Sequence, residues 1–461
     1  MAKVNVSLPQ GTRDFGPDTV RKRNYIFNTI RSVFELYGFE PLETPAMENL
    51  DTLMGKYGDE GDKLIFKILN NGLDRPEKEK QARDDFEKIL AGKNVAGITE
   101  RALKYDLTIP FARYVAMNYN KLSFPFKRYQ VQPVWRADKP QRGRYREFYQ
   151  CDADIVGSNA LLNEVELASI YATVFEKLKI NVEIKINSRK LLSALAEISG
   201  GLDKMMDITI AIDKLDKVGL EKVKLELNGR GLNNKQVVII DKYLAIAEYS
   251  GDNKMVMDEL KKLFVENASG NEGLKDLQFI LDNTGQLAFT SKILVDPTLA
   301  RGLNYYTGTI FEVKAADVKM GSIGGGGRYD DLTGLFGVPG VPGVGISFGV
   351  DRIYDVMEEL DLFPEEVHTG TQALFFNLGE KESQIAFSLM QQLRNQNVRC
   401  ELYHETAKFD KQFKYAEKKN IPYAVIMGSK ELEDNSCVIK DLRTGEQQTL
   451  PADRLLGFSF T

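Results

Sequence analysis

The sequence is poor in the residues that build disulfides, zinc sites and histidine-based catalytic sites. Its 461 residues include only three cysteines and two histidines. Cys151, Cys400 and Cys437 show no C-x-x-C spacing, which argues against a disulfide framework or a zinc site. With only His368 and His404 available, neither a catalytic triad nor a histidine-rich metal centre is expected. We therefore predict no protein-held metal site.

Long apolar runs and the common nucleotide-binding fingerprints are also missing. No run approaches the roughly 18 apolar residues that span a bilayer, and the N-terminal MAKVNVSLPQG has no apolar signal core. We therefore expect a cytoplasmic protein without membrane contact. The chain contains neither a G-x-x-x-x-G-K-[ST] loop nor a G-x-G-x-x-G that opens a helix. A bound nucleotide would need a different scaffold.

Length and charge limit the number of domains and the class of protein. A chain of 461 residues predicts two or three domains, and 43% hydrophobic residues is an ordinary globular content. The 61 basic and 66 acidic residues give a net charge of −5, which argues against a general nucleic-acid coat protein. This net charge is compatible with a local basic face, because phosphate contacts act within about 8–10 Å.

Periodicity divides the chain into segments of different character. Residues 19–37 have helical spacing, and a strand–turn–strand pattern occupies 126–157. Charged helical stretches separated by Gly and Asn turns fill 195–290, which indicates a helical insertion. After a linker at 361–371, strands alternate with helices to the end of the chain. That order predicts a small α/β domain.

The segment 127–157 carries the richest pattern. Read with period two, one face of its second strand presents Arg144, Arg146, Phe148, Gln150, Asp152 and Asp154. The preceding strand presents Gln130, Gln132, Val134 and Arg136, and 139–143 form the turn. Such a face is too polar to bury without a ligand. It suits a ligand with an apolar plate, an anionic middle and a cationic end. A solvated outer strand with cross-strand ion pairs explains the pattern equally well.

Three further segments are rich in glycine. LARGLNYYTGTIFEV (299–313) places Arg301 beside glycine and two adjacent tyrosines, although a hairpin of packed tyrosines fits it better. GSIGGGGRYDDL (321–332) leaves room for a ligand beside the backbone, the alternative being a flexible surface loop. Asp351 fits the N-cap of a last helix whose first turn holds Arg352, facing the glycine-rich strands, although a surface arginine explains that position better by itself.

Taken together, these segments resemble class II aminoacyl-tRNA synthetases of the histidyl-tRNA synthetase family, over nearly the whole chain from QGTRDFGPD (10–18). GFEPLETPAMENLD looks like motif 1, with Pro45 at the interface, and FKRYQVQPVWRADKPQRGRYREFYQ looks like motif 2. GVGISFGVDRIYDVM looks like motif 3. ALKYDLTIPFARY, LARGLNYYTG and GGGGRYDDL are similar to segments that mark the histidine-specific branch. The order of the motifs makes the resemblance specific.

The resemblance implies an α+β catalytic domain, with a six- or seven-stranded antiparallel sheet flanked by helices, a helical insertion and a C-terminal anticodon-binding α/β domain. It implies a homodimer formed through motif 1. The predicted division is 1–194 and 291–365 for the two parts of the catalytic domain, 195–290 for the insertion and 366–461 for the anticodon-binding domain.

Roles at the site are also implied by the resemblance. Histidine and ATP with Mg²⁺ would form histidyl-adenylate, and the histidyl group would pass to the 3′ end of its tRNA. Arg136 would grip the α-phosphate and the histidine carboxylate, and Arg301 would stabilise the transition state. The residues implied for ATP are Arg136, Asp138, Arg144, Phe148, Gly349 and Arg352. Those implied for histidine are Asp106, Thr108, Gln150, Asp154, Arg301, Tyr305 and Tyr306, with Asp154 and Tyr306 reading the two imidazole nitrogens.

Contacts to tRNA rest on weaker signals. Lys139, Gln141 and Arg142 lie in the predicted turn of motif 2. Lys408, Lys411 and Lys414 share the face of a predicted helix with Lys418, a pattern that by itself is more typical of a solvated helix. We predict that both groups contact tRNA, because the resemblance makes the last domain the anticodon binder.

The sequence departs from the family pattern at three positions. Asn304 replaces a common acidic residue, and Asp106 and Asp154 stand where many bacterial members carry glutamate. A regulatory paralogue that binds histidine and controls histidine synthesis is the main alternative function. The retained arginines of the site and the roughly 90 residues after the catalytic region favour the enzyme.

Overall fold

A computed structural model describes residues 6–54, 62–287, 290–300, 305–368 and 370–460. The chain divides into two compact units. Unit 1 comprises Met1–Asp14 and Arg23–Leu362, and unit 2 comprises Phe15–Lys22 and Phe363–Thr461. No helix in the described ranges is long and apolar enough to cross a membrane.

Unit 1 is built on a mixed sheet, which has eight strands within the described residues, in the order β1-β5-β6-β11-β10-β9-β7-β8. The six inner strands from β5 to β7 pair antiparallel throughout. The strands are β1 (Glu40–Pro41), β5 (Phe126–Trp135), β6 (Glu147–Val156), β7 (Val182–Ser188), β8 (Lys292–Val295), β9 (Thr309–Ala315), β10 (Gly324–Asp330) and β11 (Pro342–Gly349).

The two edge strands correct the prediction of a wholly antiparallel sheet. β1 joins β5 in parallel, and β8 joins β7 in parallel. Parallel neighbours need a crossover connection, usually helical. The chain supplies one between β7 and β8, where the helical insertion stands. β1 has only two residues, so periodicity could not have revealed it.

The predicted hairpin of 126–157 is confirmed in β5 and β6. Gln130 pairs with Asp152, and Gln132 pairs with Gln150, so the two polar rows share one face of the sheet. The glycine-rich segment is a central strand rather than a surface loop: β10 lies between β9 and β11. Within these rows Gln130, Asp152 and Asp154 are buried, whereas Arg144 before β6 is exposed.

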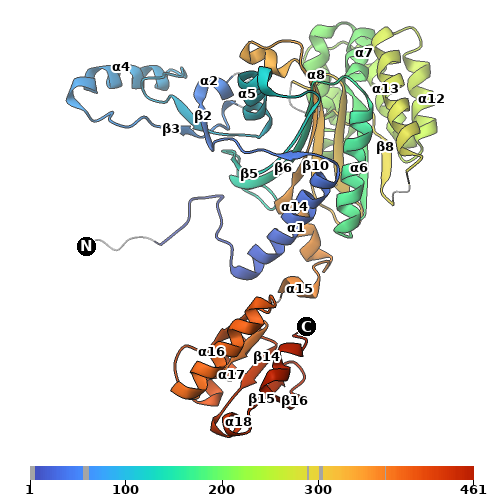
Figure 1. Ribbon diagram of the computed structural model, residues 1–461. Helices are drawn as coiled ribbons and strands as arrows, with labels where there is room; N and C mark the ends of the chain where they lie inside the picture. Colours follow the sequence, from blue (N-terminus) through green and yellow to red (C-terminus); the bar gives the residue numbers. More distant parts are fainter. Residues whose placement is uncertain (1–5, 55–61, 288–289, 301–304, 369, 461) are drawn as a thin grey trace. The chain divides into compact units, whose positions relative to one another are not determined.

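Helices cover this sheet (Figure 1). α6 packs against β7 and β11, and α14 packs against β6 and β11. The predicted helix at 19–37 is α1. The helices of this region are α1 (Pro17–Leu36), α2 (Leu50–Leu53), α5 (Thr108–Asn118), α6 (Leu162–Lys177) and α14 (Val350–Glu359).

A small second sheet carries an arm away from the main one (Figure 1). Its strands are β2 (Met47–Asn49), β3 (Lys67–Ile68) and β4 (Arg101–Leu103), in the order β2-β4-β3. The charged stretch after β3 forms η1 (Pro76–Lys78) and α4 (Glu79–Leu90).

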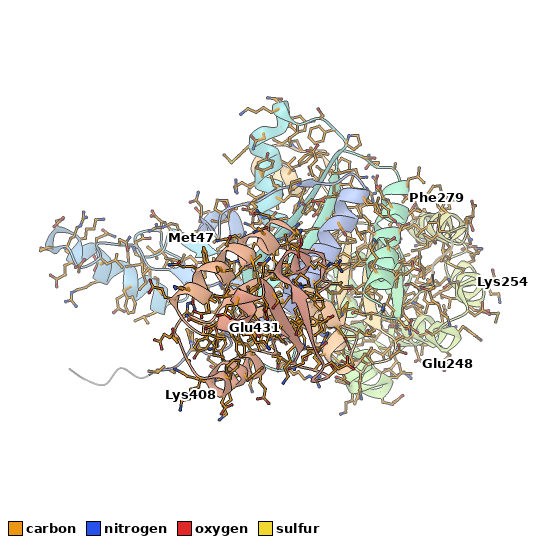
Figure 2. The ribbon with its side chains drawn as sticks, turned by 60° about the horizontal axis from the view of Figure 1, so that its bottom comes forward. Met47, Glu248, Lys254, Phe279, Lys408 and Glu431 are labelled. Atoms are coloured by element: carbon orange, nitrogen blue, oxygen red, sulfur yellow. The ribbon has the colours of Figure 1, made fainter. Side chains whose placement is uncertain are left out.

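The predicted insertion, 195–290, is helical in the described residues, and the helix that leads into it begins at Arg189. Side-chain caps explain its Asn- and Asp-marked turns, because Asn233, Asp252 and Asn267 each accept a backbone N–H of the helix they precede. Its helices are α7 (Arg189–Ser199), α8 (Met205–Ile212), α9 (Leu215–Val218), α10 (Leu220–Gly229), α11 (Asn234–Ala245), α12 (Asn253–Leu263) and α13 (Ala268–Thr284). Glu248, Lys254 and Phe279 mark this region in Figure 2.

Unit 2 has the alternating β and α order that the sequence predicts. Its sheet order is β13-β12-β14-β15-β16, with parallel pairs around β12 and antiparallel pairs from β14 onward. The strands are β12 (Ala373–Phe375), β13 (Cys400–Leu402), β14 (Tyr423–Ile426), β15 (Ser436–Asp441) and β16 (Gln447–Pro451). The helices are α16 (Glu380–Asn395), α17 (Phe409–Lys418) and α18 (Ser429–Glu433), and a short α15 (Glu365–His368) lies within the predicted linker.

Candidate active site

A small cavity of about 60 Å³ opens above the centre of the main sheet. A single water needs about 10–15 Å³ of such space, so the cavity has room for roughly four to six water-sized atoms. That is the size of an imidazole ring. Its lining comes from β6, β10, β11, the start of α5 and the segment before β9, and comprises Asp106, Thr108, Arg136, Gln150, Asp152, Asp154, Tyr305, Tyr306, Gly325, Gly326, Tyr329, Gly345, Ile346 and Ser347.

Six of the seven residues predicted for histidine line this cavity, together with Arg136. The seventh, Arg301, lies outside the described residues. Sequence reasoning missed Asp152, Tyr329 and Ser347 as lining residues. Asp152 was on the predicted polar face, but the resemblance gave it no role.

Asp154 is held by two partners at the floor of the cavity. Its Oδ1 accepts the Tyr329 hydroxyl at 2.5 Å, and its Oδ2 lies 2.9 Å from the Arg128 guanidinium. Arg128 is fully buried and stacks on the Phe111 ring at 4.2 Å. Burial raises the pKa of the Asp154 carboxyl, and Arg128 opposes that rise. Arg128 was missed, although it extends the alternating row of β5 by one step.

Glycines allow polar side chains to lie against the central strands. A Cβ at Gly345 would stand 2.0 Å from Oδ1 of Asp154, and a Cβ at Gly327 would stand 2.9 Å from the Tyr306 ring. Real Cβ atoms do not approach this closely, so only glycine lets both side chains reach the cavity. Burial raises the pKa of the Tyr306 hydroxyl, and the nearby carboxylates add to the effect.

Asp152 is the second carboxylate of β6 in the cavity. Its side chain is buried, and it pairs with Gln130 on β5 and Ser347 on β11 in the strand register. Burial raises the pKa of the Asp152 carboxyl to about 7, while the Arg128 charge lowers it and the Asp154 charge raises it.

The start of α5 brings two more polar groups to the cavity. Asp106 is buried and accepts the backbone N–H of Ile109 at 3.1 Å, which orders the first turn of the helix. Thr108 is the first residue of the helix and lines the cavity. A carboxylate and a hydroxyl here can receive an ammonium group.

Arg136 lies at the mouth of the cavity, just after β5. Its Nε donates to the Tyr105 carbonyl at 3.1 Å, and a terminal nitrogen lies 3.4 Å from Oε1 of Gln150. The guanidinium stands 4.4 Å from the Tyr105 ring centre and 5.1 Å from that of Phe148. These contacts fix a planar cation beside a ring, where it can meet a carboxylate or a phosphate.

The loop after β5 carries the other predicted ATP residues. Arg144 makes two parallel bonds of 2.8 Å to the buried Asp138, so their charges already neutralise each other. Phe148 is half-buried on β6. Gly349 ends β11 and donates to the Ile323 carbonyl at 2.9 Å.

Helix α14 holds that loop from one side. Arg352 donates to the carbonyl of Gly143 at 2.9 Å and to that of Ser322 at 2.7 Å, so it faces the loop and the glycine-rich strands as predicted. The N-cap assignment for Asp351 is wrong, because Gly349 is the N-cap. Asp351 instead binds two arginines, Arg13 and Arg23, and the latter lies 2.5 Å away.

The residues predicted for tRNA are exposed. Lys139, Gln141 and Arg142 occupy the tip of the loop, where Arg142 pairs with Glu359 at 2.7 Å. In unit 2, Lys408 precedes α17 and lies at the periphery of the unit (Figure 2). Lys411, Lys414 and Lys418 are exposed along the same helix.

Groups of three or more potential metal-binding side chains are absent from the described residues. The three cysteines are free and buried. Two larger hollows, of about 400 and 600 Å³, lie away from this cavity and share no residue with it.

Comparison with known proteins places these features in one family. The model described as histidyl-tRNA synthetase matches residues 83–353, and one described as anticodon binding domain matches 372–458. The chain is 52% identical to histidine–tRNA ligase of Phocaeicola vulgatus over 457 residues, covering 97% of the chain and 98% of the relative. It is 52% identical to that of Porphyromonas gingivalis, covering 97% of each. A crystal structure of histidyl-tRNA synthetase from Nostoc sp. PCC 7120 matches with a TM-score of 0.80 and 32% identity, over 99% of both chains.

Proposed function

Because the chain belongs to the histidyl-tRNA synthetase family and is a histidine–tRNA ligase, we propose that the cavity on β6, β10 and β11 is its histidine site. The observation that carries this proposal is the convergence of Asp106, Gln150, Asp154 and Tyr306 on a space the size of an imidazole ring. The regulatory alternative lacks support, since the curated relatives that are 52% identical over 97% of the chain are ligases.

Histidine fits the cavity with its ring inward. Asp154 accepts one imidazole N–H, and the Tyr306 hydroxyl and Tyr305 contact the ring. The α-ammonium group meets Asp106 and Thr108 at the start of α5, with Gln150 beside it. The carboxylate then points toward Arg136. A polar pocket of this kind rejects residues that lack ring nitrogens, because its buried groups would be left without partners.

ATP binds next to this cavity along the loop after β5. Phe148 and Arg352 sandwich the adenine, Asp138 meets its edge, and Gly349 allows close approach to the backbone. Arg144 takes the outer phosphates, which requires it to exchange Asp138 for phosphate oxygens. Magnesium arrives with the ATP phosphates as part of the substrate.

The first reaction is an in-line attack by the histidine carboxylate on the α-phosphorus, which releases pyrophosphate. Arg136 holds both reacting groups, and Arg301 neutralises charge that develops on the α-phosphoryl group. No protein nucleophile takes part. The histidyl group then passes to the 3′ end of the tRNA, guided by Lys139, Gln141 and Arg142.

The wider organisation follows the same family pattern. We assign 1–194 and 291–365 to the catalytic domain, 195–290 to the insertion and 366–461 to the anticodon-binding domain. Lys408, Lys411 and Lys414 of the anticodon-binding domain contact tRNA phosphates. The enzyme works in the cytoplasm as a homodimer through α1 and the segment around Pro45. Light scattering at micromolar concentration tests this assembly, and a fully active monomer would contradict it.

The decisive experiment is exchange of pyrophosphate into ATP, measured with each of the twenty amino acids. Histidine should give the fastest exchange. Arg301→Ala should slow adenylate formation by roughly 3 kcal/mol of transition-state stabilisation, with a smaller effect on ATP binding. Faster exchange with another amino acid would disprove the proposed pocket, and unchanged exchange in the variant would give Arg301 a structural role.

A further inference from the structure

Asp152 lines the cavity and has one carboxylate oxygen to which no described residue donates a hydrogen bond. Its side chain is 3% exposed, and its Oδ1 has no hydrogen-bond partner among the described residues. Ser347 hydrogen-bonds the carboxyl group. Asp154 differs in its ion pair: its Oδ1 accepts the Tyr329 hydroxyl, and its Oδ2, although it makes no hydrogen bond of good geometry, lies 2.9 Å from the Arg128 guanidinium. A buried acceptor without a partner is unfavourable by about 1–3 kcal/mol, so a ligand donor here is expected.

The charges around Asp152 do not balance. Gln130 on β5, Ser347 on β11 and the tyrosine hydroxyls of the cavity are neutral. Among the described residues, Arg128 is the cation that pairs with a carboxylate of β6, namely Asp154. Lys104 is also close to Asp152, but it donates to Gln132 and to the Thr44 carbonyl. Arg136 lines the cavity but contacts Tyr105 and Gln150, and Asp106 adds a further negative charge. One guanidinium neutralises one carboxylate, which leaves Asp152 to be balanced by a proton or a ligand.

We propose that Asp152 is a specificity residue for histidine, and that its Oδ1, rather than the Tyr306 hydroxyl that the family resemblance implies, shares one proton with the imidazole nitrogen that Asp154 does not contact. This proposal rests on the histidine site proposed above. A neutral imidazole brings one N–H, which Asp154 accepts, and one bare nitrogen. The shared proton lies on Asp152 as a carboxylic acid or on the ring as imidazolium. No covalent bond forms or breaks other than the N–H or O–H bond of that proton.

Binding of neutral histidine to the ionised pocket therefore takes up one proton from water. The burial that raises the pKa of Asp152 to about 7 places this uptake within the neutral pH range. As the pH rises above about 7, free Asp152 loses its proton, so histidine binding should weaken by up to about tenfold per pH unit. Asp152→Asn should remove this dependence, because an amide N–H can donate to the bare nitrogen without a proton from water.

Calorimetry of histidine binding at pH 8, in buffers that differ in ionisation enthalpy, measures proton uptake directly. The unaltered protein should take up close to one proton per histidine, and Asp152→Asn much less. Asp152→Ser, whose hydroxyl can also donate, serves as a second variant if the first is unstable. Asp296→Asn is the matched control, because Asp296 is a mostly buried carboxylate that pairs with Lys185 away from the cavity. It should keep the full proton uptake.

Steady-state exchange gives the second readout. Between pH 6.5 and pH 8.5, kcat/KM for histidine should fall in the unaltered enzyme and stay flatter in Asp152→Asn, while the KM for ATP is the same in both. The ratio of kcat/KM for histidine to kcat/KM for its weakly basic triazole analogue should be smaller in Asp152→Asn than in the unaltered enzyme. Proton uptake and pH slopes equal to those of the unaltered enzyme would overturn the role of Asp152. Failure of histidine to bind to the unaltered protein would instead overturn the proposed function.

Discussion

The N-terminal segment 9–13 lies against the loop that carries the proposed ATP residues. The Gly11 carbonyl accepts the backbone N–H of Arg146 at 2.9 Å, and the Arg13 guanidinium stands 3.3 Å from the centre of the Tyr145 ring. Arg13 also binds Asp351, next to the Arg352 that holds the loop from the other side. We predict that Arg13→Ala loosens the loop and weakens the use of ATP.

The magnitude follows from what the substitution removes. A hydrogen bond to a charged group contributes about 1.5–3 kcal/mol, and a cation–π contact at a partly exposed site about 0.5–1. Asp351 keeps its bond to Arg23, so no carboxylate is left unpaired. Arg13 is 28% exposed, which weakens both interactions. We expect a net loss of about 1–2 kcal/mol, or roughly fivefold to thirtyfold in kcat/KM for ATP.

Pyrophosphate exchange at saturating histidine and varied ATP measures the effect. Tyr145→Phe keeps the ring and should behave like the unaltered enzyme, whereas Tyr145→Leu should lose part of the same activity. The KM for histidine should change little in all three variants. Normal kcat/KM for ATP in Arg13→Ala, or an equal loss for ATP and histidine, would refute a specific role in ordering the loop.

Three further predictions concern stability and tRNA. Glu164→Gln should lower the free energy of unfolding in urea by about 3–5 kcal/mol, because the buried Arg328 would lose the carboxylate that accepts its two hydrogen bonds of 2.5 and 2.7 Å. The double variant Glu164→Gln, Arg328→Met should regain part of this stability. Burial lowers the pKa of Lys104 from 10.5 to about 8, so the unfolded chain binds the extra proton between these values. The free energy of unfolding of the unaltered protein minus that of Lys104→Met should therefore rise by about 3 kcal/mol from pH 8 to 10.5. A difference that does not change with pH would contradict this prediction. Replacing Lys411 and Lys414 with Glu should raise the KM for tRNA and flatten its salt dependence while exchange stays intact; an equal fall in exchange would assign the lysines to packing.

Local patterns in the sequence predicted the elements that depend on local physics. Alternation over 126–157 gave β5 and β6 and their shared polar face, because side chains of a strand alternate whatever the strand pairs with. The helical insertion and the order of unit 2 were also predicted. Several site residues now meet in one cavity, although their roles in binding remain predictions.

Features that depend on distant partners were not predictable in the same way. The four glycines at 324–327 carry no side-chain periodicity, so only pairing with β9 and β11 shows that they form a strand. Asp351 has the residue type of an N-cap, but its carboxylate forms ion pairs with two arginines from the N-terminal region. Arg128 escaped notice because a buried arginine is rare unless a carboxylate stands beside it, and Asp154 is 26 residues away in sequence.

The parallel pairing of β7 and β8 limits how the enzyme could be shortened. Glu183 to Ile186 lie beside Lys292 to Val295 in the same direction, so the chain must return along the whole strand before β8 begins. A two-residue turn can join antiparallel strands only, and a parallel return needs a dozen or more residues. α13, which packs on β7 and α6, already makes that return. A compact version of this synthetase could therefore dispense with the outer helices of the insertion but not with a crossover helix in the place of α13.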